Sequence, residues 1–358
     1  MSDSQQHSIE DTIAAIPALD SAAQAQARRR QDSLTKPQGS LGRLEELSVQ
    51  IAGVTAKPLP RLEHKAVFLM AGDHGVVAEG VSAYPQAVTM QMVLNFLRGG
   101  AAINVLARQV GARVVVTDMG VAGDLPVDPR LRVRKLARGT ANMALGPAMS
   151  RTQAVQALQA GIESLRQELS LGLDIAGTGD MGIGNTTPSA AIATVLTGEP
   201  ASEIAGRGTG VDDAGLQRKL SAIERALAIN QPDPKDGLDV LAKVGGFEIG
   251  ALAGVMLGAA AQRIPVVVDG FISTAAAMIA VSLAPQVRGY LIAAHRSQER
   301  GHQIMLDWLG LKPLLDLDLR LGEGTGAVLG MFLADCACRI LAEMATFSEA
   351  GVAEREQP

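Results

Sequence analysis

The chain has 358 residues, of which 47% are hydrophobic and 19% charged, and its formal net charge is −5. These values are typical of a globular protein with a large core. Because no basic stripe carries interleaved aromatics, they also argue against a nucleic-acid-binding surface. Aromatic residues make up only 3%, so the core must consist of Ala, Val, Leu, Ile and Met. We therefore expect an α/β protein in which small-residue helices pack on a Val/Ile-rich sheet.

Three features predict a cytoplasmic protein without a membrane segment. Residues 1–11 are polar and lack the basic start and apolar block of a signal peptide. The longest nearly uncharged apolar run, residues 249–261, is too short to span a bilayer. Cys336 and Cys338 lie in an apolar, helix-like run, where core thiols are favoured over a metal site or a disulfide, and sparse cysteine fits a reducing compartment.

Residues 1–60 are expected to be helical. Segments 21–30 and 43–52 are rich in helix-forming residues, and a Gly- and Pro-containing stretch at 34–42 separates them. The sequence Lys-Pro-Leu-Pro at 57–60 then breaks the helical pattern before the main domain.

Five continuous apolar runs of strand length follow, and each ends in polar residues. The runs cover residues 66–71, 114–117, 173–176, 265–268 and 290–294. Unbroken runs of this kind are typical of strands that are buried on both faces of a parallel sheet. Helical patterns at 89–105, 151–170 and 214–228 lie between them. The alternation predicts βαβ units, with functional residues in the crevice beyond the carboxyl ends of the strands.

Residues 177–189 read Gly-Thr-Gly-Asp-Met-Gly-Ile-Gly-Asn-Thr-Thr-Pro-Ser. We interpret them as a long loop between a strand at 173–176 and a helix that begins after Pro188, with Thr186 or Thr187 as N-cap. The free N–H groups and the dipole of a helix N-terminus favour an anion, most often a phosphate. The glycine spacing is not a dinucleotide fingerprint, because the expected helix begins too late, and no Lys follows as in a P-loop. A plain strand-to-helix turn without a ligand is the alternative.

Two loop carboxylates are candidates for chemistry. Glu323 lies between Gly322 and Gly324, immediately before a long apolar helix at 327–347. It fits a general base, because an apolar pocket raises the pKa of a carboxyl toward neutrality, and it equally fits a helix-capping residue in a turn. Asp180 either supports the site or organises its loop by accepting backbone N–H groups.

Other polar residues also admit two interpretations. Arg218 and Lys219 follow a second glycine-rich loop at 206–210 and could meet a phosphate or form the solvated face of a surface helix. The strand-end residues are Asp73, His74, Asp118, Asp269 and His295. They could form a two-metal hydrolase site, but no H-x-H or H-E-x-x-H spacing occurs, so buried, hydrogen-bonded groups are favoured for most of them. A nucleotide-binding module without chemistry is a third possibility.

Nine motifs, taken together and in order, resemble one family. They are LTKPQGSLGRLE at 34–45, AGDHGV at 71–76, GGAAIN at 99–104, GIGNTTP at 182–188, GRGTG at 206–210, GGFEI at 245–249, DGF at 269–271, AHRS at 294–297 and GEGTG at 322–326. The chain in this respect is similar to the nicotinate-nucleotide:dimethylbenzimidazole phosphoribosyltransferases, which prepare the lower ligand of cobalamin. Any one motif is weak, but nine in sequence order are specific.

The resemblance implies a reaction and an architecture. A benzimidazole nitrogen attacks C1′ of nicotinate mononucleotide, nicotinate leaves, and an α-ribotide forms with inversion, without a metal or redox cofactor. The implied fold is a Rossmann-like domain with a six-stranded, mostly parallel sheet flanked by helices, which we place at residues 61–326. A small helical domain would combine residues 1–60 with the C-terminal helix and tail at 327–358, and the protein would be a homodimer of cytoplasmic enzyme subunits.

The resemblance also implies site residues. Glu323 would be the catalytic base, with Asp180 as a second carboxylate, and no metal ligand is expected. The residues that would bind the nucleotide phosphate are Gly179, Gly182, Gly184, Asn185, Thr186, Gly208, Lys219 and Ser297. Those that would bind the azole base are Ser82, Tyr84, Gln91 and Leu321. The chain departs from the family pattern at Asp180, where Glu is frequent, and at Gln38, which replaces a Pro.

Overall fold

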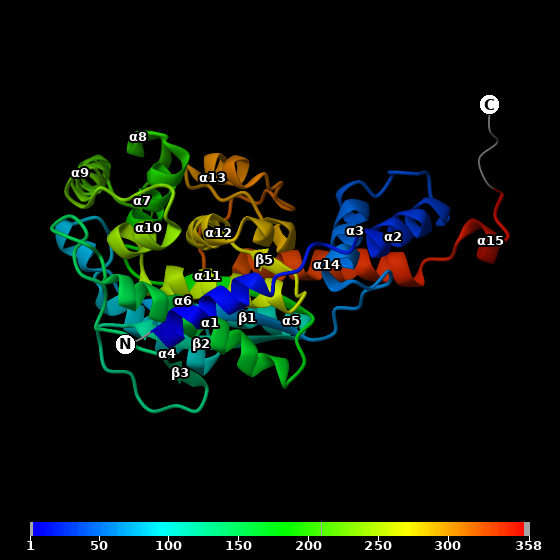
Figure 1. Cartoon of the computed structure of the whole chain (residues 1–358), viewed down its shortest axis with the longest axis horizontal. Helices are drawn as coiled ribbons and strands as arrows, with labels where there is room; N and C mark the ends of the chain where they lie inside the picture. The colour runs from blue at the N-terminus through cyan, green and yellow to red at the C-terminus, as the bar shows by residue number, and fades with distance from the viewer. Residues whose placement is uncertain (1–2, 209, 354–358) are drawn as a thin grey trace.

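A computed structural model describes residues 3–208 and 210–353 and centres on one six-stranded parallel sheet (Figure 1). The strands are β1 (Lys65–Gly72), β2 (Ala112–Gly120), β3 (Leu131–Val133), β4 (Ile175–Met181), β5 (Val266–Val268) and β6 (Leu291–Ala293). Their order is β3-β2-β1-β4-β5-β6, and every neighbouring pair is parallel. From β1 the chain adds β2 and β3 on one side of the sheet, and it then adds β4, β5 and β6 on the other side. The strand order therefore reverses between β1 and β4, which is where open α/β sheets bind ligands.

Helices cover both faces of the sheet. The α-helices are α1 (Asp3–Ala14), α2 (Ser21–Ser33), α3 (Arg43–Thr55), α4 (Ala87–Arg98), α5 (Ala102–Val110), α6 (Arg151–Leu169), α7 (Thr186–Thr197), α8 (Ala201–Ile204), α9 (Asp213–Asn230), α10 (Gly237–Val244), α11 (Phe247–Ala261), α12 (Phe271–Leu283), α13 (His302–Leu309), α14 (Thr325–Glu343) and α15 (Phe347–Ala350). Two 3₁₀ helices, η1 (Gly75–Glu79) and η2 (Pro285–Tyr290), complete the set.

The side chains of β1 divide between two apolar cores, because successive residues of a strand point to opposite faces. Phe68 and Met70 join the core that contains α6, α7, α11 and α12. Val67 and Leu69 join the core that contains α3, α4, α5 and α14. The unbroken apolar run seen in the sequence thus reflects burial on both faces, as expected for a central parallel strand.

Small residues allow the central helices to approach closely. A Cβ built on Gly161 of α6 would overlap the Ala251 carbonyl group, and one built on Gly254 of α11 would overlap the Leu158 carbonyl group. The two helices therefore pack backbone against backbone, which accounts for the Gly/Ala-rich sequence of α11.

The two ends of the chain meet at α14. The helices α2 and α3 pack against each other and against α14, to one side of the sheet (Figure 1). The guanidinium of Arg30 donates to the carbonyl oxygens of Leu341, Ala342 and Met344, which satisfies the end of α14. By contrast, α1 packs on α6 and α11. The division of the chain at residues 60 and 326 stays a prediction.

The glycine-rich segment 177–189 contains less loop than the sequence suggests. Strand β4 continues through Asp180 to Met181, and α7 begins at Thr186, so only residues 182–185 connect them. The prediction that Thr186 or Thr187 caps the helix is wrong, because Asn185 occupies that position without a side-chain cap. Pro188 lies in the first turn, where its missing N–H has no helical partner to lose.

Packing explains why β4 carries glycines. A Cβ on Gly177 would lie 2.7 Å from the Met331 Cε atom, and one on Gly179 would overlap the backbone of Glu323. The start of α14 and the loop before it therefore lie directly on β4.

Two further expectations need correction. The helix expected at 89–105 is divided into α4 and α5, because Gly99 adopts a left-handed conformation with φ 79° and ends α4. The sequence patterns indicate five strands and miss β3, which has only three residues and no continuous apolar run.

Within the described residues, α14 is the one helix long and apolar enough to cross a membrane, and 56% of its apolar window is buried against the rest of the protein. That burial is typical of a core helix.

Candidate active site

A cavity of about 420 Å³ opens at the carboxyl ends of β4, β5 and β6. Its polar lining includes Asp180, Glu323, His295 and Glu299. A larger groove, about 590 Å³, lies beside the start of α6, but its charged side chains are already paired, as in the contact between Lys243 and Asp239. The strand-end cavity combines carboxylates that have no cationic partner among the described residues with the topological switch point of the sheet.

Glu323 is held in an unusual backbone conformation at the cavity wall. Its φ is 63°, and its glycine neighbours at 322 and 324 also have positive φ, so the loop turns sharply before α14. The side chain is only 5% exposed, and Oε2 accepts a hydrogen bond of 3.3 Å from the Ile103 N–H. Burial raises the pKa of the Glu323 carboxyl above its ordinary value, and the charge of Asp269 adds to the effect.

Asp269, and not Glu323, caps α14. Its carboxylate accepts hydrogen bonds from the Gly324 N–H at 3.1 Å and the Ala327 N–H at 3.0 Å. Its own N–H donates to the Thr178 hydroxyl of β4. Asp269 therefore ties the Glu323 loop to β4 and β5, and this leaves the Glu323 carboxylate free to face the cavity.

Asp180 faces the same cavity from the end of β4. Its Oδ2 accepts a hydrogen bond of 2.9 Å from the side-chain amide of Asn185. Burial raises the pKa of Asp180 to about 8, and the negative charge of Asp269 contributes. A Cβ on Gly322 would lie 3.4 Å from both Asp180 oxygens, so the loop before Glu323 passes beside this carboxyl. The two candidate carboxylates thus share one site.

The other end of the cavity contains a helix N-terminus and a buried cation. Thr186 begins α7, and its hydroxyl lies 3.0 Å from the Lys219 Nζ, which also donates to the Gly206 carbonyl group. Lys219 is 1% exposed, so its interpretation as part of a solvated face is wrong. Burial lowers the pKa of Lys219 to about 8. A helix N-terminus beside an ammonium group suits a phosphate.

The structure brings most predicted nucleotide-binding residues to this cavity. Gly182, Asn185, Thr186, Gly208 and Ser297 line it, and Lys219 reaches it through Thr186. Gly179 and Gly184 do not line it: Gly179 lies under the Glu323 backbone, and a Cβ on Gly184 would lie 2.6 Å from the Val77 Cγ2. Gly184 has φ 87°, so its role is to form the turn.

The predicted azole-binding residues divide equally. Tyr84 and Leu321 line the cavity, whereas Ser82 and Gln91 are not part of its wall. Sequence reasoning missed Val88 and Met92, which do line it. Val88 and Met92 are four residues apart and so lie on one face of α4, and this periodicity is the signal that could have identified them.

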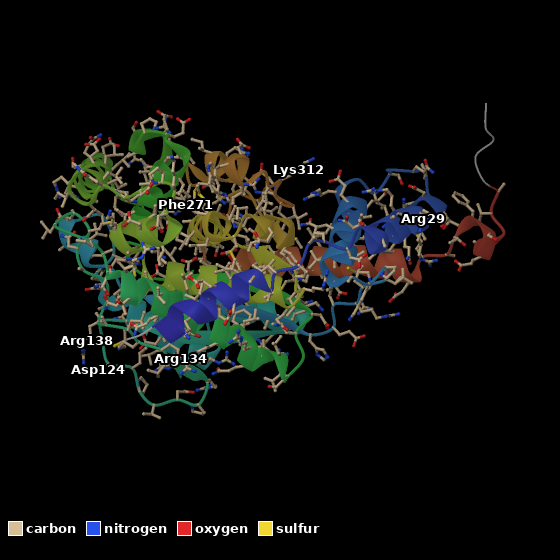
Figure 2. All side chains as sticks on the ribbon, viewed as in Figure 1. Arg29, Asp124, Arg134, Arg138, Phe271 and Lys312 are labelled. Carbon is tan, nitrogen blue, oxygen red and sulfur yellow. The ribbon has the colours of Figure 1, made fainter. Side chains whose placement is uncertain are left out.

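Apolar side chains from α12 complete the wall. Phe271 and Ile272 follow β5 and line the cavity. Phe271 is 3% exposed, and Figure 2 shows it within the outline of the α/β body, whereas Arg138 lies at the edge of the view. The cavity therefore offers an apolar, partly aromatic surface next to its carboxylates.

Two other strand-end residues, Asp73 and Asp118, accept hydrogen bonds from the backbone, as favoured by the sequence. Asp73 accepts the Ala122 N–H at 2.7 Å, and Asp118 accepts the Val121 N–H at 2.8 Å. In the part of the chain that the structure describes, no three His, Cys, Asp or Glu side chains converge in a way that could hold a metal ion.

Comparisons with known proteins agree with the motifs. A family described as phosphoribosyltransferase matches residues 16–352. A nicotinate-nucleotide–dimethylbenzimidazole phosphoribosyltransferase of Roseiflexus sp. is 66% identical over 344 residues, which cover 96% of this chain and 98% of the relative. The enzyme of that name from Geobacter sulfurreducens is 57% identical over 344 residues, again covering 96% and 98%.

A solved structure gives the same result at the level of the fold. The crystal structure of the nicotinate-nucleotide–dimethylbenzimidazole phosphoribosyltransferase from Thermus thermophilus has a TM-score of 0.90 and 50% sequence identity. The match covers 94% of this chain and all of that chain. This match, together with the six-stranded parallel sheet flanked by helices in the present chain, confirms the predicted fold class. This chain belongs to the nicotinate-nucleotide–dimethylbenzimidazole phosphoribosyltransferase family.

Proposed function

We propose that this protein transfers the phosphoribosyl group of nicotinate mononucleotide to 5,6-dimethylbenzimidazole, in the lower-ligand branch of cobalamin biosynthesis. The products are nicotinate and α-ribazole 5′-phosphate. The observation that carries the proposal is the cavity itself, which places two buried carboxyls at one end and a buried lysine beside a helix N-terminus at the other.

The carboxyl end suits a ribosyl transfer. The azole nitrogen forms a bond to C1′ while the bond from C1′ to nicotinate breaks, and the bonding pair stays on the pyridine nitrogen. The second azole nitrogen then loses its proton to Glu323, whose raised pKa makes it a stronger base than an exposed carboxylate. The negative charge of the carboxyl cluster stabilises an oxocarbenium-like transition state, and attack from the face opposite the leaving group gives inversion.

Asp180 and Glu323 have different tasks in this proposal. Two neighbouring carboxyls do not both ionise readily, and Asp180, whose pKa is about 8, is the one that keeps its proton at neutral pH. It then donates a hydrogen bond to the bound nucleotide while Glu323 remains ionised as the base. Pairs of carboxyls with separated pKa values divide acid and base roles in this way.

The opposite end anchors the nucleotide phosphate. We place the phosphate where Thr186 at the start of α7 and Ser297 line the cavity, with the Lys219 ammonium behind Thr186, and this position holds C1′ in line between the two bases. The apolar wall formed by Met92, Phe271 and Leu321 is the surface on which we place the flat benzimidazole ring.

We also propose that the protein is a homodimer in the cytoplasm. Support for a second subunit comes from exposed apolar side chains, since Leu321 at the cavity wall is 58% and Phe332 of α14 is 54% exposed. Light scattering at micromolar protein concentration measures the oligomeric state directly.

The function is tested by mixing the protein with nicotinate mononucleotide and dimethylbenzimidazole and measuring nicotinate and the α-ribotide by chromatography. Equal amounts of both products, formed only when the azole is present, are expected. Release of nicotinate without the azole would indicate a hydrolase. Binding of the nucleotide without nicotinate release would indicate a binding module, and either result contradicts the proposal.

A further inference from the structure

A buried ion pair lies behind the wall of the cavity. His74 follows β1, and Glu248 is the second residue of α11, yet the His74 Nε2 and the Glu248 Oε1 are 2.7 Å apart. Their side chains are 1% and 0% exposed, and neither lines the cavity. The pair therefore cannot touch a substrate directly.

The pair supports the turn at residues 182–185 from beneath. A Cβ on Gly182 would lie 3.2 Å from the His74 Nε2, and a Cβ on Gly246 would lie 2.6 Å from the His74 Cε1. A Cβ on Gly72 would lie 3.0 Å from the Glu248 Oε2. Three backbone segments, from β1, from the end of β4 and from the start of α11, thus close around the imidazole and the carboxylate.

Stability alone does not account for the pair. A buried ion pair loses the hydration of both charges, and a pair of apolar residues of similar size is often as stable or more stable. Moreover, the His74 Nδ1 and the Glu248 Oε2 have no hydrogen-bond partner in the described part of the protein. These unpaired polar atoms add to the energetic cost of the pair, which points to a role other than stability.

The pair also contributes to the charge of the site. Burial disfavours a charged imidazole, but the Glu248 carboxylate outweighs burial and raises the pKa of His74, and the adjacent Asp73 adds to this. Glu248 also raises the pKa of Asp180, after the larger effects of burial and Asp269. Asp73 and Asp180 are titratable groups whose pKa values respond to the charges of this pair.

We propose that His74 and Glu248 are positioning residues of the nucleotide subsite. Their hydrogen-bonded pair fixes the position of the turn at residues 182–185. Through that turn, the pair places the start of α7 beside the phosphate and the Asn185 side chain beside Asp180. The inference rests on the proposed function, because the turn matters through the nucleotide that it holds.

The test compares two variants that differ in what they retain. The double variant His74→Leu/Glu248→Leu replaces the pair with apolar side chains. We expect it to fold and to raise both the KM and the calorimetric Kd for nicotinate mononucleotide at least tenfold, with little change in the KM for dimethylbenzimidazole.

The variant Glu248→Gln keeps the shape of the Glu248 side chain and its hydrogen bond to His74 but loses its negative charge. We expect its nucleotide Kd to stay within about threefold of wild type, while the basic limb of its kcat–pH profile moves to lower pH because Asp180 loses a negative neighbour.

A matched control separates positioning from general destabilisation. Glu168 is also a buried carboxylate, 3% exposed and paired with Arg113 and Arg132, but it lies away from the cavity. Glu168→Gln should lower the melting temperature and leave both KM values and the pH profile unchanged.

Three results would overturn the inference. They are an unchanged nucleotide Kd in a folded double variant, a rise in the KM for both substrates by the same factor, and an unshifted basic limb in Glu248→Gln. If the double variant does not fold, the pH profile of Glu248→Gln decides. Calorimetry does not require turnover, so a wild-type protein that binds the nucleotide but transfers nothing would contradict the proposed function and leave the positioning inference standing.

Discussion

Replacing Asp180 with Asn should make the protein more stable at neutral pH. The buried carboxyl has a pKa of about 8 in the folded protein against 3.8 when exposed. The folded state therefore holds a proton that the unfolded state releases, and folding stability falls as pH rises from about 4 to about 8. An Asn at this position keeps an oxygen that accepts the Asn185 hydrogen bond and has no proton to lose.

The size of the effect follows from the shift. About 3 pH units separate the exposed pKa from pH 7, and at about 1.4 kcal/mol per unit this gives an upper value of about 4 kcal/mol. Because the side chain borders an open cavity that admits water, we expect about 2–4 kcal/mol. With an unfolding entropy of about 2 cal/mol/K per residue over 358 residues, that is a rise in melting temperature of about 3–5 °C.

The assay is thermal unfolding of wild type and Asp180→Asn at a series of pH values between about 4 and 9. The two proteins should melt together at the acidic end, and the variant should gain progressively until about pH 8. The variant should also transfer the phosphoribosyl group more slowly. A difference in melting temperature that does not change with pH would refute the reasoning, as would a variant that is less stable at pH 8.

Three other changes test separate parts of the structure. Glu323→Gln should lower kcat on the order of 10²-fold or more without lowering the melting temperature, since a positioned base supplies about that much, and a near-wild-type rate would exclude Glu323 as the base. At pH values above about 8, the KM of the wild type for the nucleotide should increase, because Lys219 loses its proton. The variant Lys219→Met should have a KM at least tenfold higher than that of the wild type at neutral pH, and its KM should not increase further above about pH 8. Gly254→Ala should destabilise the protein by about 3 kcal/mol or more, because the new methyl group overlaps the Leu158 carbonyl group, and a melting temperature equal to that of wild type would contradict the close helix packing.

The sequence predicts strands that are buried on both faces more reliably than it predicts glycine-rich ones. The runs that became β1 and β5 are continuous and apolar, so pattern and burial agree. In β4, the residues Gly177 and Gly179 look like a loop because glycine is poor in strands on its own. Only the close approach of α14 and the Glu323 loop, which come much later in the chain, explains why glycine is required there.

In the candidate site too, features that depend on local sequence could be predicted, and features that depend on tertiary contacts could not. Glu323 and Asp180 could be predicted because a carboxylate in a glycine-rich stretch is visible locally, and both face the cavity. The burial of Lys219 could not, since its helix looks polar and its contacts with Thr186 and Gly206 are made across the fold. Asp269 looked like one strand-end carboxylate among several, and its special place beneath Glu323 depends on tertiary contacts with residues 324 and 327.

The contacts around α14 have a consequence for the order of folding. Its far end is held by Arg30, which is 311 residues away from Leu341 in the chain, and its near end carries the Glu323 loop. Contacts of such long range form late, because closing a long loop costs entropy before any contact rewards it. During synthesis the helices α2 and α3 must therefore wait for α14 with an apolar face uncovered. The step that finally covers that face also brings Glu323 to the sheet, so a nascent chain gains its proposed base only when its first and last helices have met.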